Sequence, residues 1–213
     1  MYPEAISDSI WGLLRRLNSI PDMKSCYLGG GTGLALQLGH RQSDDLDFFV
    51  RDQLDVLSIA RSEALEGLEV VIMNQAPHHT EMKLNSIKVD FLREQFPLRF
   101  HLKAVNTQME NLTMADARDI GRMKLLSIGS RGSKKDFVDL YCLTRELIAL
   151  DTLITAAMTE DRGVRYSKLL FLKGLVDFED AEHEPELSMI WDVTWEEAKR
   201  SLIKEIRAIA NKI

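Results

Sequence analysis

Residues 28–49 read LGGGTGLALQLGHRQSDDLDFF, and this stretch decides how the N-terminal half of the chain folds. The apolar run before the glycines predicts a strand, the apolar residues Thr32–Leu38 predict a helix, and Leu46–Val50 predicts a second strand. Glycine has no Cβ, so the turn between the first strand and the helix lets another group approach the backbone closely.

This turn has the features of an anion-binding site. Gly30, Gly31 and Thr32 stand where a strand gives way to a helix N-terminus, and N–H groups there can hold phosphate oxygens. A Walker A loop is excluded because no Lys follows, and a dinucleotide fingerprint fails because Leu36 stands in place of its third glycine. A plain tight turn is the alternative for the glycines alone.

Three acidic residues are predicted to share one face of a sheet. Asp45 and Asp47 alternate along a strand, so their side chains point the same way, and Asp90 lies in IKVDFL, another predicted strand. If the two strands are neighbours, the carboxylates converge. Because they repel one another without a cation, they predict a Mg²⁺ site that could align an attacking oxygen with a phosphate. An exposed strand end is the alternative for Asp-x-Asp alone.

The remaining pattern predicts a mixed α/β half followed by a helical half. Predicted strands lie at Ser25–Leu28, Leu68–Met73, Thr80–Leu84 and Ile87–Leu92, with Asn85-Ser86 as a tight hairpin turn and an extended piece at 99–105; predicted helices lie at 5–18, 53–65, 146–158, 165–176 and 194–212. Thr113-x-x-Asp116 and Ser133-x-x-Asp136 are typical of capping boxes, and Gly132 predicts the end of the helix between them. The predicted domains are 1–108 (α/β, α+β) and 109–213 (helical).

Composition and charge limit the function classes. The chain has 213 residues, of which 45% are hydrophobic, so it can build a core, and its two cysteines favour a reducing compartment. The N-terminus does not resemble a signal peptide, and no apolar run is long enough to span a bilayer, so we expect a cytoplasmic protein with no membrane partner. The net charge is −6, yet Arg99–Lys135 holds eight basic residues against three acidic ones, and Asp177–Glu197 holds nine acids with no Lys or Arg. Two solvated faces of opposite sign and an anion-binding centre are both consistent with this distribution.

The stretch GGGTGLALQLGHRQSDDLDFF resembles the opening motif of the AbiEii/AbiGii toxin family, a branch of the DNA polymerase β-like nucleotidyltransferases. The resemblance continues through ADARDIGRMKLLSIGSRGSKKDFVDLYCLTRE and into DFEDAEHEP and VTWEEAKR, so it covers nearly the whole chain; Gly33 replaces a commoner alanine. It implies a mixed sheet with flanking helices and a C-terminal helical bundle that completes the nucleotide site, a Mg²⁺–NTP site, and a role as the toxin of a toxin–antitoxin pair.

The second block adds further candidate residues. Lys124 and Arg131 are two helical turns apart and could bind a triphosphate together, although a solvated cationic face is the alternative. Asp136 fits the capping box, and the resemblance implies an active-site aspartate at Asp136 or Asp139 without deciding between them. His40-Arg41 matches the family motif; His40, after Gly39, is interpreted as fastening its loop, with a direct chemical role as the alternative, and His78-His79 is predicted to lie in a loop.

These features predict a Mg²⁺-dependent transfer of a nucleoside monophosphate from an NTP to an acceptor, with release of pyrophosphate. The catalytic set is Asp45, Asp47, Asp90, Lys124, Asp136 and Asp139; the metal ligands are Asp45, Asp47 and Asp90; the nucleotide ligands are Gly30, Gly31, Thr32, Lys124 and Arg131. RNA, tRNA in particular, is the expected acceptor, with protein as the main variant, and an antitoxin is the expected protein partner. A nucleotide-binding regulator that acts through a partner is the alternative, and a metal-dependent phosphohydrolase is disfavoured because histidine-rich metal motifs are absent.

Overall fold

The computed structural model describes residues 1–51, 54–94, 97–158 and 166–212. In this part of the chain, one mixed sheet has the strand order β3-β4-β5-β2-β1-β7-β6. The strands are β1 (Cys26–Leu28), β2 (Leu46–Val50), β3 (Val70–Ala76), β4 (His79–Leu84), β5 (Ile87–Arg93), β6 (Lys103–Ala104) and β7 (Thr113–Met114). The pairs β2–β5 and β1–β7 are parallel, and the other neighbours are antiparallel.

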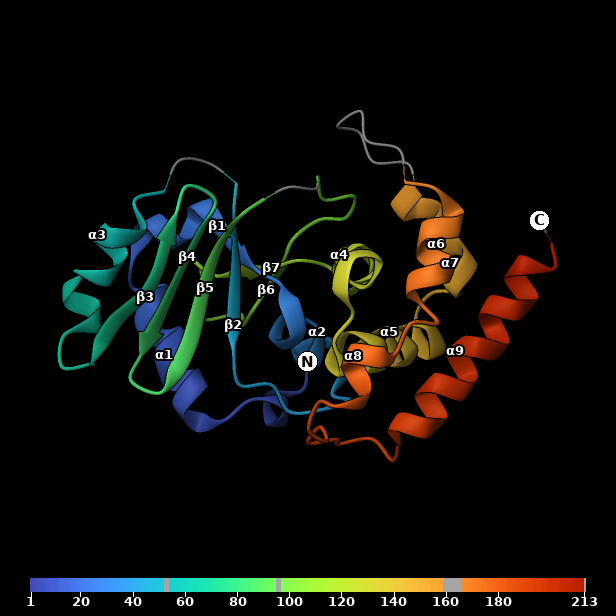
Figure 1. The fold of residues 1–213 in the computed structure, drawn as a ribbon. Coiled ribbons are helices and arrows are strands. Elements are labelled where there is room, and N and C mark those ends of the chain that lie inside the picture. Colours follow the sequence, from blue (N-terminus) through green and yellow to red (C-terminus); the bar gives the residue numbers. More distant parts are fainter. Residues whose placement is uncertain (52–53, 95–96, 159–165, 213) are drawn as a thin grey trace.

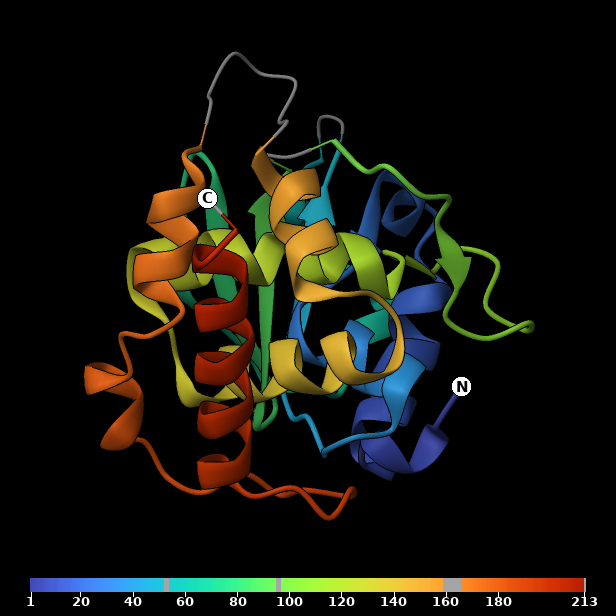
Figure 2. The same cartoon turned by 90° about the vertical axis from the view of Figure 1, so that its right-hand side faces the viewer.

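Helices lie on both faces of this sheet. They are α1 (Asp8–Asn18), α2 (Gly30–Leu38), α3 (Val56–Ala60), α4 (Ala117–Arg131), α5 (Lys134–Glu146), α6 (Leu150–Met158), α7 (Lys168–Gly174), α8 (Glu179–Glu182) and α9 (Trp195–Ala210). Figure 1 shows α1 and α3 on one side of the sheet, α4 to α9 on the other, and α2 between the sheet and the later helices. In Figure 2, which faces the helical side, α9 is the outermost helix.

Local sequence signals explain where several elements begin and end. Ser7 caps α1 by accepting a hydrogen bond from the Ile10 amide, and Gly39 ends α2 with a left-handed φ of +67°. The hairpin between β4 and β5 turns at Asn85, whose φ of +54° is the conformation that a two-residue turn requires. The predicted hairpin is therefore confirmed.

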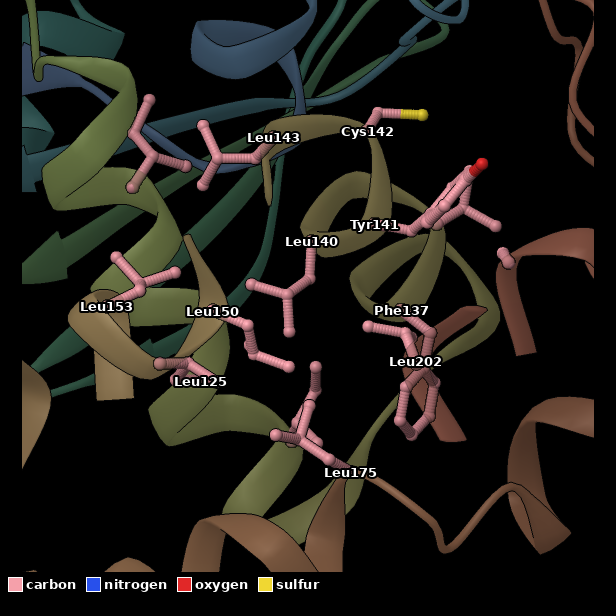
Figure 3. Packing of buried hydrophobic residues seen from close by; sticks show 14 of the residues in the cluster. Leu125, Phe137, Leu140, Tyr141, Cys142, Leu143, Leu150, Leu153, Leu175 and Leu202 are labelled. Atoms are coloured by element: carbon pink, nitrogen blue, oxygen red, sulfur yellow. The ribbon is translucent and has the colours of Figure 1, made fainter. Parts of the chain in front are cut away.

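Two groups of buried apolar residues hold the layers together. One joins α1 to the sheet through residues such as Leu14, Phe48 and Val89. The other joins α2 to the C-terminal helices, and Figure 3 shows Leu125, Leu140 and other side chains of this group packed against one another. Because α2 contributes to both groups, its N-terminus is held in place from two sides.

Several predicted boundaries need correction. Thr113 does not cap a helix: it lies in β7, and Asp116 caps α4 by accepting from the Arg118 amide. The predicted helix 53–65 is reduced to α3 and a 3₁₀ turn at Glu63–Leu65, with position 53 outside the described residues. The extended piece at 99–105 keeps two strand residues, and the helix predicted at 146–158 begins at Leu150 because α5 continues to Glu146.

The helix α8 was not predicted. The domain boundary at 108 stays a prediction; β7 follows it and still pairs with β1. Within the described residues, no helix is long and apolar enough to cross a membrane.

Candidate functional site

The glycine turn packs directly against the side chain of Asp47. The Gly29 amide donates a 2.8 Å hydrogen bond to the Asp47 carbonyl, and Gly30 has a left-handed φ of +55°. A Cβ atom on Gly30 would lie 1.8 Å from Asp47 Oδ2. This position therefore requires glycine, both for its backbone conformation and for the space that the carboxylate occupies.

The N-terminus of α2 carries the backbone N–H groups of Gly30, Gly31 and Thr32. The N-cap residue Gly29 makes no side-chain cap, and first-turn N–H groups have no partner within their own helix. The Thr32 side chain is buried: its hydroxyl donates to the Asp45 carbonyl and lies 2.9 Å from Ser43 Oγ. Thr32 thus uses its side chain to hold the segment before β2, and its backbone remains at the mouth of the turn.

Asp47 and Asp90 lie side by side on the sheet. They are register partners in the parallel pair β2–β5, so their side chains point to the same face. Burial raises the pKa of Asp47 above its ordinary value, and the Asp90 carboxylate raises it further. Asp45 precedes β2, its side chain is 43% exposed, and its charge adds a smaller contribution to the same rise in the pKa of Asp47. The arrangement favours a cation beside these carboxylates.

The surroundings of Asp90 differ from the sequence prediction. His79 is the first residue of β4 rather than part of a loop, and its Nε2 lies 2.5 Å from Asp90 Oδ1. Lys88 Nζ lies 3.0 Å from Asp90 Oδ2. Among the described residues, the possible metal ligands whose atoms lie within 4.8 Å of one another are His79, Glu81 and Asp90, and this set does not include Asp45 or Asp47.

A buried ion-pair network joins α4, α5 and the loop after α2. Asp139 is fully buried and receives contacts from Arg41 Nε (2.6 Å) and Nη2 (2.9 Å), His40 Nε2 (2.7 Å) and Lys124 Nζ (2.6 Å). Burial opposes ionisation of Asp139, but the Arg41 guanidinium and the Lys124 ammonium outweigh it and hold the pKa of Asp139 well below its ordinary range. Asp139 is therefore an internal anchor for cations rather than an open ligand.

Asp136 serves two partners. It completes the capping box with Ser133, which confirms that prediction, and its Oδ1 accepts a 2.8 Å hydrogen bond from Lys124 Nζ. Lys124 is thus held between Asp136 and Asp139, and its charge partly offsets the rise in the pKa of Asp47. Lys124 thus links the helical half to Asp47 and Asp90, which form the acidic pair on the sheet.

Arg41 also touches the glycine turn. A Cβ atom on Gly31 would lie 2.4 Å from Arg41 Nη2, so the guanidinium that Asp139 holds is packed against the turn. The neighbouring His40 bonds to the same carboxylate. The interpretation of His40 as fastening its loop is confirmed by this contact, and Arg41 holds the same carboxylate.

Lys135 is a candidate that the sequence analysis missed. Its Nζ lies 3.7 Å from Asp45 Oδ2, and its side chain is half exposed. Its charge lowers the pKa of Asp47 and so partly offsets the effect of burial. The capping box at the start of α5 fixes which way Lys135 faces, but the sequence does not place α5 beside β2. Arg131 ends α4, and its side chain lies outside the described part of the structure.

Comparison with known proteins identifies the family. Residues 12–211 match the family model described as nucleotidyl transferase AbiEii toxin, type IV toxin–antitoxin system. The chain belongs to the AbiEii family. It is accordingly a nucleotidyltransferase of a toxin–antitoxin family, and membership implies an NTP substrate, a divalent metal and an antitoxin.

Relatives of this AbiEii protein support the assignment. An uncharacterized protein of Aquifex aeolicus (strain VF5) is 32% identical over 196 residues, which cover 89% of this chain and 92% of the relative. A candidate nucleotidyltransferase of Helicobacter pylori superposes with a TM-score of 0.59 at 17% identity, over 100% of this chain and 97% of the other. MenT4, a nucleotidyltransferase toxin of Mycobacterium tuberculosis H37Rv, gives a TM-score of 0.56 at 15% identity, over 91% and 84%. The mixed sheet with flanking helices and a helical C-terminal region is therefore a nucleotidyltransferase-like fold, as predicted.

Proposed function

We propose that this AbiEii protein transfers a nucleoside monophosphate from an NTP to RNA, with tRNA as the first acceptor to test. An RNA hydroxyl oxygen attacks the α-phosphorus and forms the new O–P bond. The bond from the α-phosphorus to its bridging oxygen breaks, and pyrophosphate leaves. One of the three carboxylates takes the hydroxyl proton. The observation that carries the proposal is the side-by-side placement of Asp47 and Asp90 against the glycine turn.

Asp45, Asp47 and Asp90 offer the donor chemistry of a Mg²⁺ site, but their oxygens do not all lie within 4.8 Å of one another, so a bound ion would have to draw them together. Their donors are all carboxylate oxygens, which this hard cation prefers, and the raised pKa of Asp47 reflects burial and negative charge that a cation would relieve. His79 bonds to Oδ1 of Asp90 and Lys88 to Oδ2, so together they hold both oxygens and orient the carboxylate, as outer-shell partners of metal ligands do. When bound there, Mg²⁺ would neutralise charge on the phosphate oxygens and so favour the attack.

The phosphates would bind between the turn and two lysines. The N–H groups of Gly30, Gly31 and Thr32 form one side. Lys135 is half exposed and faces Asp45, so it can move to a phosphate without breaking a buried contact. Lys124 is buried and already holds two carboxylates, which suits it to supply positive potential near Asp47.

The basic segment Arg99–Lys135 gives little support for an RNA acceptor. Within the described part of the chain, at least six of its basic side chains form ion pairs: Lys103, Arg118, Arg122, Lys124, Lys134 and Lys135. Several of the paired acids lie outside the segment, so the local excess of positive charge is compensated in the folded chain.

A different surface supports an acceptor with a phosphate backbone. A cavity of about 760 Å³ at the ends of β2 and β5 is lined by residues that include Arg51, His78, His79 and Arg93. Among the described lining residues, the one carboxylate belongs to Asp55, which is used as the N-cap of α3. His79 also bonds to Asp90 and so links the rim of this cavity to the acidic pair, whereas Phe91 and Arg93 alternate with Asp90 and face the other side of the sheet.

Transfer of label tests the proposal. The full chain is incubated with Mg²⁺, each α-labelled NTP in turn, and either total RNA, purified tRNA or total protein from a bacterium. We expect label in tRNA that ribonuclease removes. Label confined to protein would contradict the acceptor, and binding of NTP without any transfer would favour a nucleotide-binding regulator.

Two matched variants complete this experiment. Asp47→Asn should abolish transfer, because it removes a carboxylate from the acidic pair. Asp44→Asn, at an exposed neighbouring position, should transfer label at the wild-type rate. Equal activity of the two variants would contradict the assignment of Asp47.

A further inference from the structure

A second cavity lies between the sheet and α4, next to the acidic pair. It has a volume of about 460 Å³, within the range of small-molecule pockets. Phe49 and Leu92 line it from the sheet, Met123, Leu126 and Ser127 from α4, and Leu170 from α7. His78 and Arg93 also line it and are shared with the cavity of about 760 Å³. Leu170, which lines the second cavity from α7, is 40% exposed.

The sheet residues that line the cavity lie on the same two strands as the acidic pair. Phe49 and Leu92 are register partners on β2 and β5, as Asp47 and Asp90 are, and each apolar residue follows its aspartate by two positions. Alternation along a strand puts all four side chains on one face, with the apolar pair about 6.6 Å further along the strands. The apolar floor of the cavity therefore begins two residues after the carboxylates on each strand.

The opposite wall comes from one face of α4. Met123, Leu126, Ser127 and Ser130 all line the cavity, and their spacing of three and four residues places them on a single helical stripe. Lys124 lies on an adjacent face of the same helix, and its charge lowers the pKa of Asp47. The same two elements, β2 and α4, thus border both the acidic pair and the apolar cavity.

An aromatic ring forms part of the floor. Phe49 stacks on Tyr27, with ring centroids 5.6 Å apart and an angle of 14° between the planes, and it also lines the cavity. Gly29 makes room for this ring, because a Cβ atom there would lie 2.6 Å from it. A ring held in this way is a rigid surface on which a flat, aromatic ligand can stack.

We propose that this cavity holds the nucleobase of the NTP whose phosphates bind at the glycine turn. The inference rests on the proposed function. A nucleobase has two apolar faces and a polar edge, and a single sugar joins it to the α-phosphate. The cavity offers matching chemistry at a matching place: an aromatic and aliphatic floor one step from Asp47, and the exposed hydroxyls of Ser127 and Ser130 on the wall. Ser127 Oγ donates to the Met123 carbonyl and Ser130 Oγ to the Ser127 carbonyl, so both hydroxyls would meet the polar edge of the base as acceptors and contribute to the choice among the four bases.

Calorimetric titrations with two kinds of ligand test the base site separately from the phosphate site. In Mg²⁺ buffer, the full chain is titrated with the α,β-methylene analogues of ATP, GTP, CTP and UTP, which cannot lose pyrophosphate, and with inorganic tripolyphosphate. We expect at least one analogue to bind about tenfold or more tightly than tripolyphosphate, the gain typical of a stacked base. If no analogue binds more tightly than tripolyphosphate, the base site is wrong and the phosphate site stands. If neither kind of ligand binds, the proposed function itself fails.

Substitutions then locate the base. Ser127→Trp puts a large side chain into the cavity from an exposed position and should abolish the preference for the analogue, with tripolyphosphate affinity unchanged. Leu170→Ala should weaken the affinity for the analogue about threefold, because it removes apolar surface from the cavity wall. Leu169→Trp and Leu169→Ala change the neighbouring residue, which is 59% exposed and does not line the cavity, and should bind as the wild type does.

Two results would overturn the base site. One is wild-type affinity of Ser127→Trp for every analogue, even if its transfer to RNA is lost, because the cavity would then serve the acceptor. The other is an equal loss of affinity for the analogue and for tripolyphosphate in a Ser127→Trp variant whose thermal unfolding matches that of the wild type. The substitution would then act on the phosphate site.

Discussion

Arg41 and Asp139 form a two-point ion pair between residues that are 98 positions apart in the chain. Nε and Nη2 of Arg41 lie 2.6 and 2.9 Å from the two carboxylate oxygens, and the carboxylate is completely buried. The pair ties the loop after α2 to α5 and presses Arg41 against Gly31. Stability of the fold and shape of the glycine turn therefore depend on the same contact.

Replacement of Asp139 by Asn should destabilise the protein strongly. Arg41 and Lys124 would lose their common counter-charge while both remain buried, which typically costs about 3–5 kcal/mol of unfolding free energy. Urea unfolding measures this loss. Asp151→Asn, which breaks the more exposed pair with Lys168, should change the midpoint little. A midpoint for Asp139→Asn equal to that of Asp151→Asn would contradict the anchoring role.

The same network predicts the pH dependence of stability. The pKa values of Asp136 and Asp139 are lowered in the folded state by their cationic partners, against the opposing effect of burial. Their contribution is therefore fully present above the unfolded-state value of about 3.9 and is lost as the pH falls through the folded-state pKa. Unfolding free energy measured from pH 6 downward should fall below about pH 4 in the wild type and less steeply in Asp139→Asn.

Two glycines should respond oppositely to the same substitution. Gly30→Ala places a methyl group on Asp47 in a left-handed conformation, so it should lower the unfolding free energy by about 1–2 kcal/mol and weaken tripolyphosphate binding. Gly12→Ala lies within α1 with no atom in the way and should stabilise by about 0.5–1 kcal/mol. Thermal unfolding and titration test both, and a neutral Gly30→Ala would show that the turn can move aside.

The two lysines near the acids should separate binding from stability. Lys135→Ala removes a half-exposed side chain and should weaken NTP binding by about 1.5–3 kcal/mol with unchanged unfolding. Lys124→Ala leaves Asp136 and Asp139 without a shared partner and should also destabilise the fold. Calorimetry measures NTP binding by both variants, and urea unfolding measures their stability. Normal NTP binding by Lys135→Ala would contradict this division of roles.

Metal addition should stabilise the protein through Asp47 and Asp90. Without metal, Asp47→Asn should unfold at a higher temperature than the wild type, because it removes one of two neighbouring, poorly solvated carboxylates. Added Mg²⁺ should raise the unfolding temperature of the wild type and of Asp44→Asn, and that of Asp47→Asn much less. An equal metal response in all three proteins would place the cation elsewhere.

The sequence was sufficient to predict the parts of the site that are local. The glycine turn, the strand after it and the capping box at Ser133 each depend on residues within a few positions, and they occur as predicted. His79 was missed because a His-His pair between two strands carries no signal of which residue begins pairing. Its alternation with Glu81 becomes meaningful only once β4 is known to lie beside β5.

Contacts between distant segments could not be predicted. Nothing in KKDFVDL indicates that Asp139 meets Arg41 and Lys124, or that Lys135 reaches Asp45, because each contact depends on how α5 packs against α2 and α4. The charge excess of Arg99–Lys135 was misleading for the same reason: acids from other elements neutralise it. The parallel pairing of β2 with β5, which joins Asp47 to Asp90, was a condition of the prediction rather than its result.

The fate of two labels in one reaction tests the central claim most directly. The full chain, Mg²⁺ and tRNA are incubated with NTP that carries label at either the α- or the γ-phosphate, and RNA and small products are separated. Attack at the α-phosphorus predicts that α-label enters RNA while γ-label leaves as pyrophosphate, and that Asp47→Asn does neither. Entry of γ-label into RNA, or release of γ-label as free phosphate without any α-label in RNA, would contradict nucleotidyl transfer at Asp47 and Asp90.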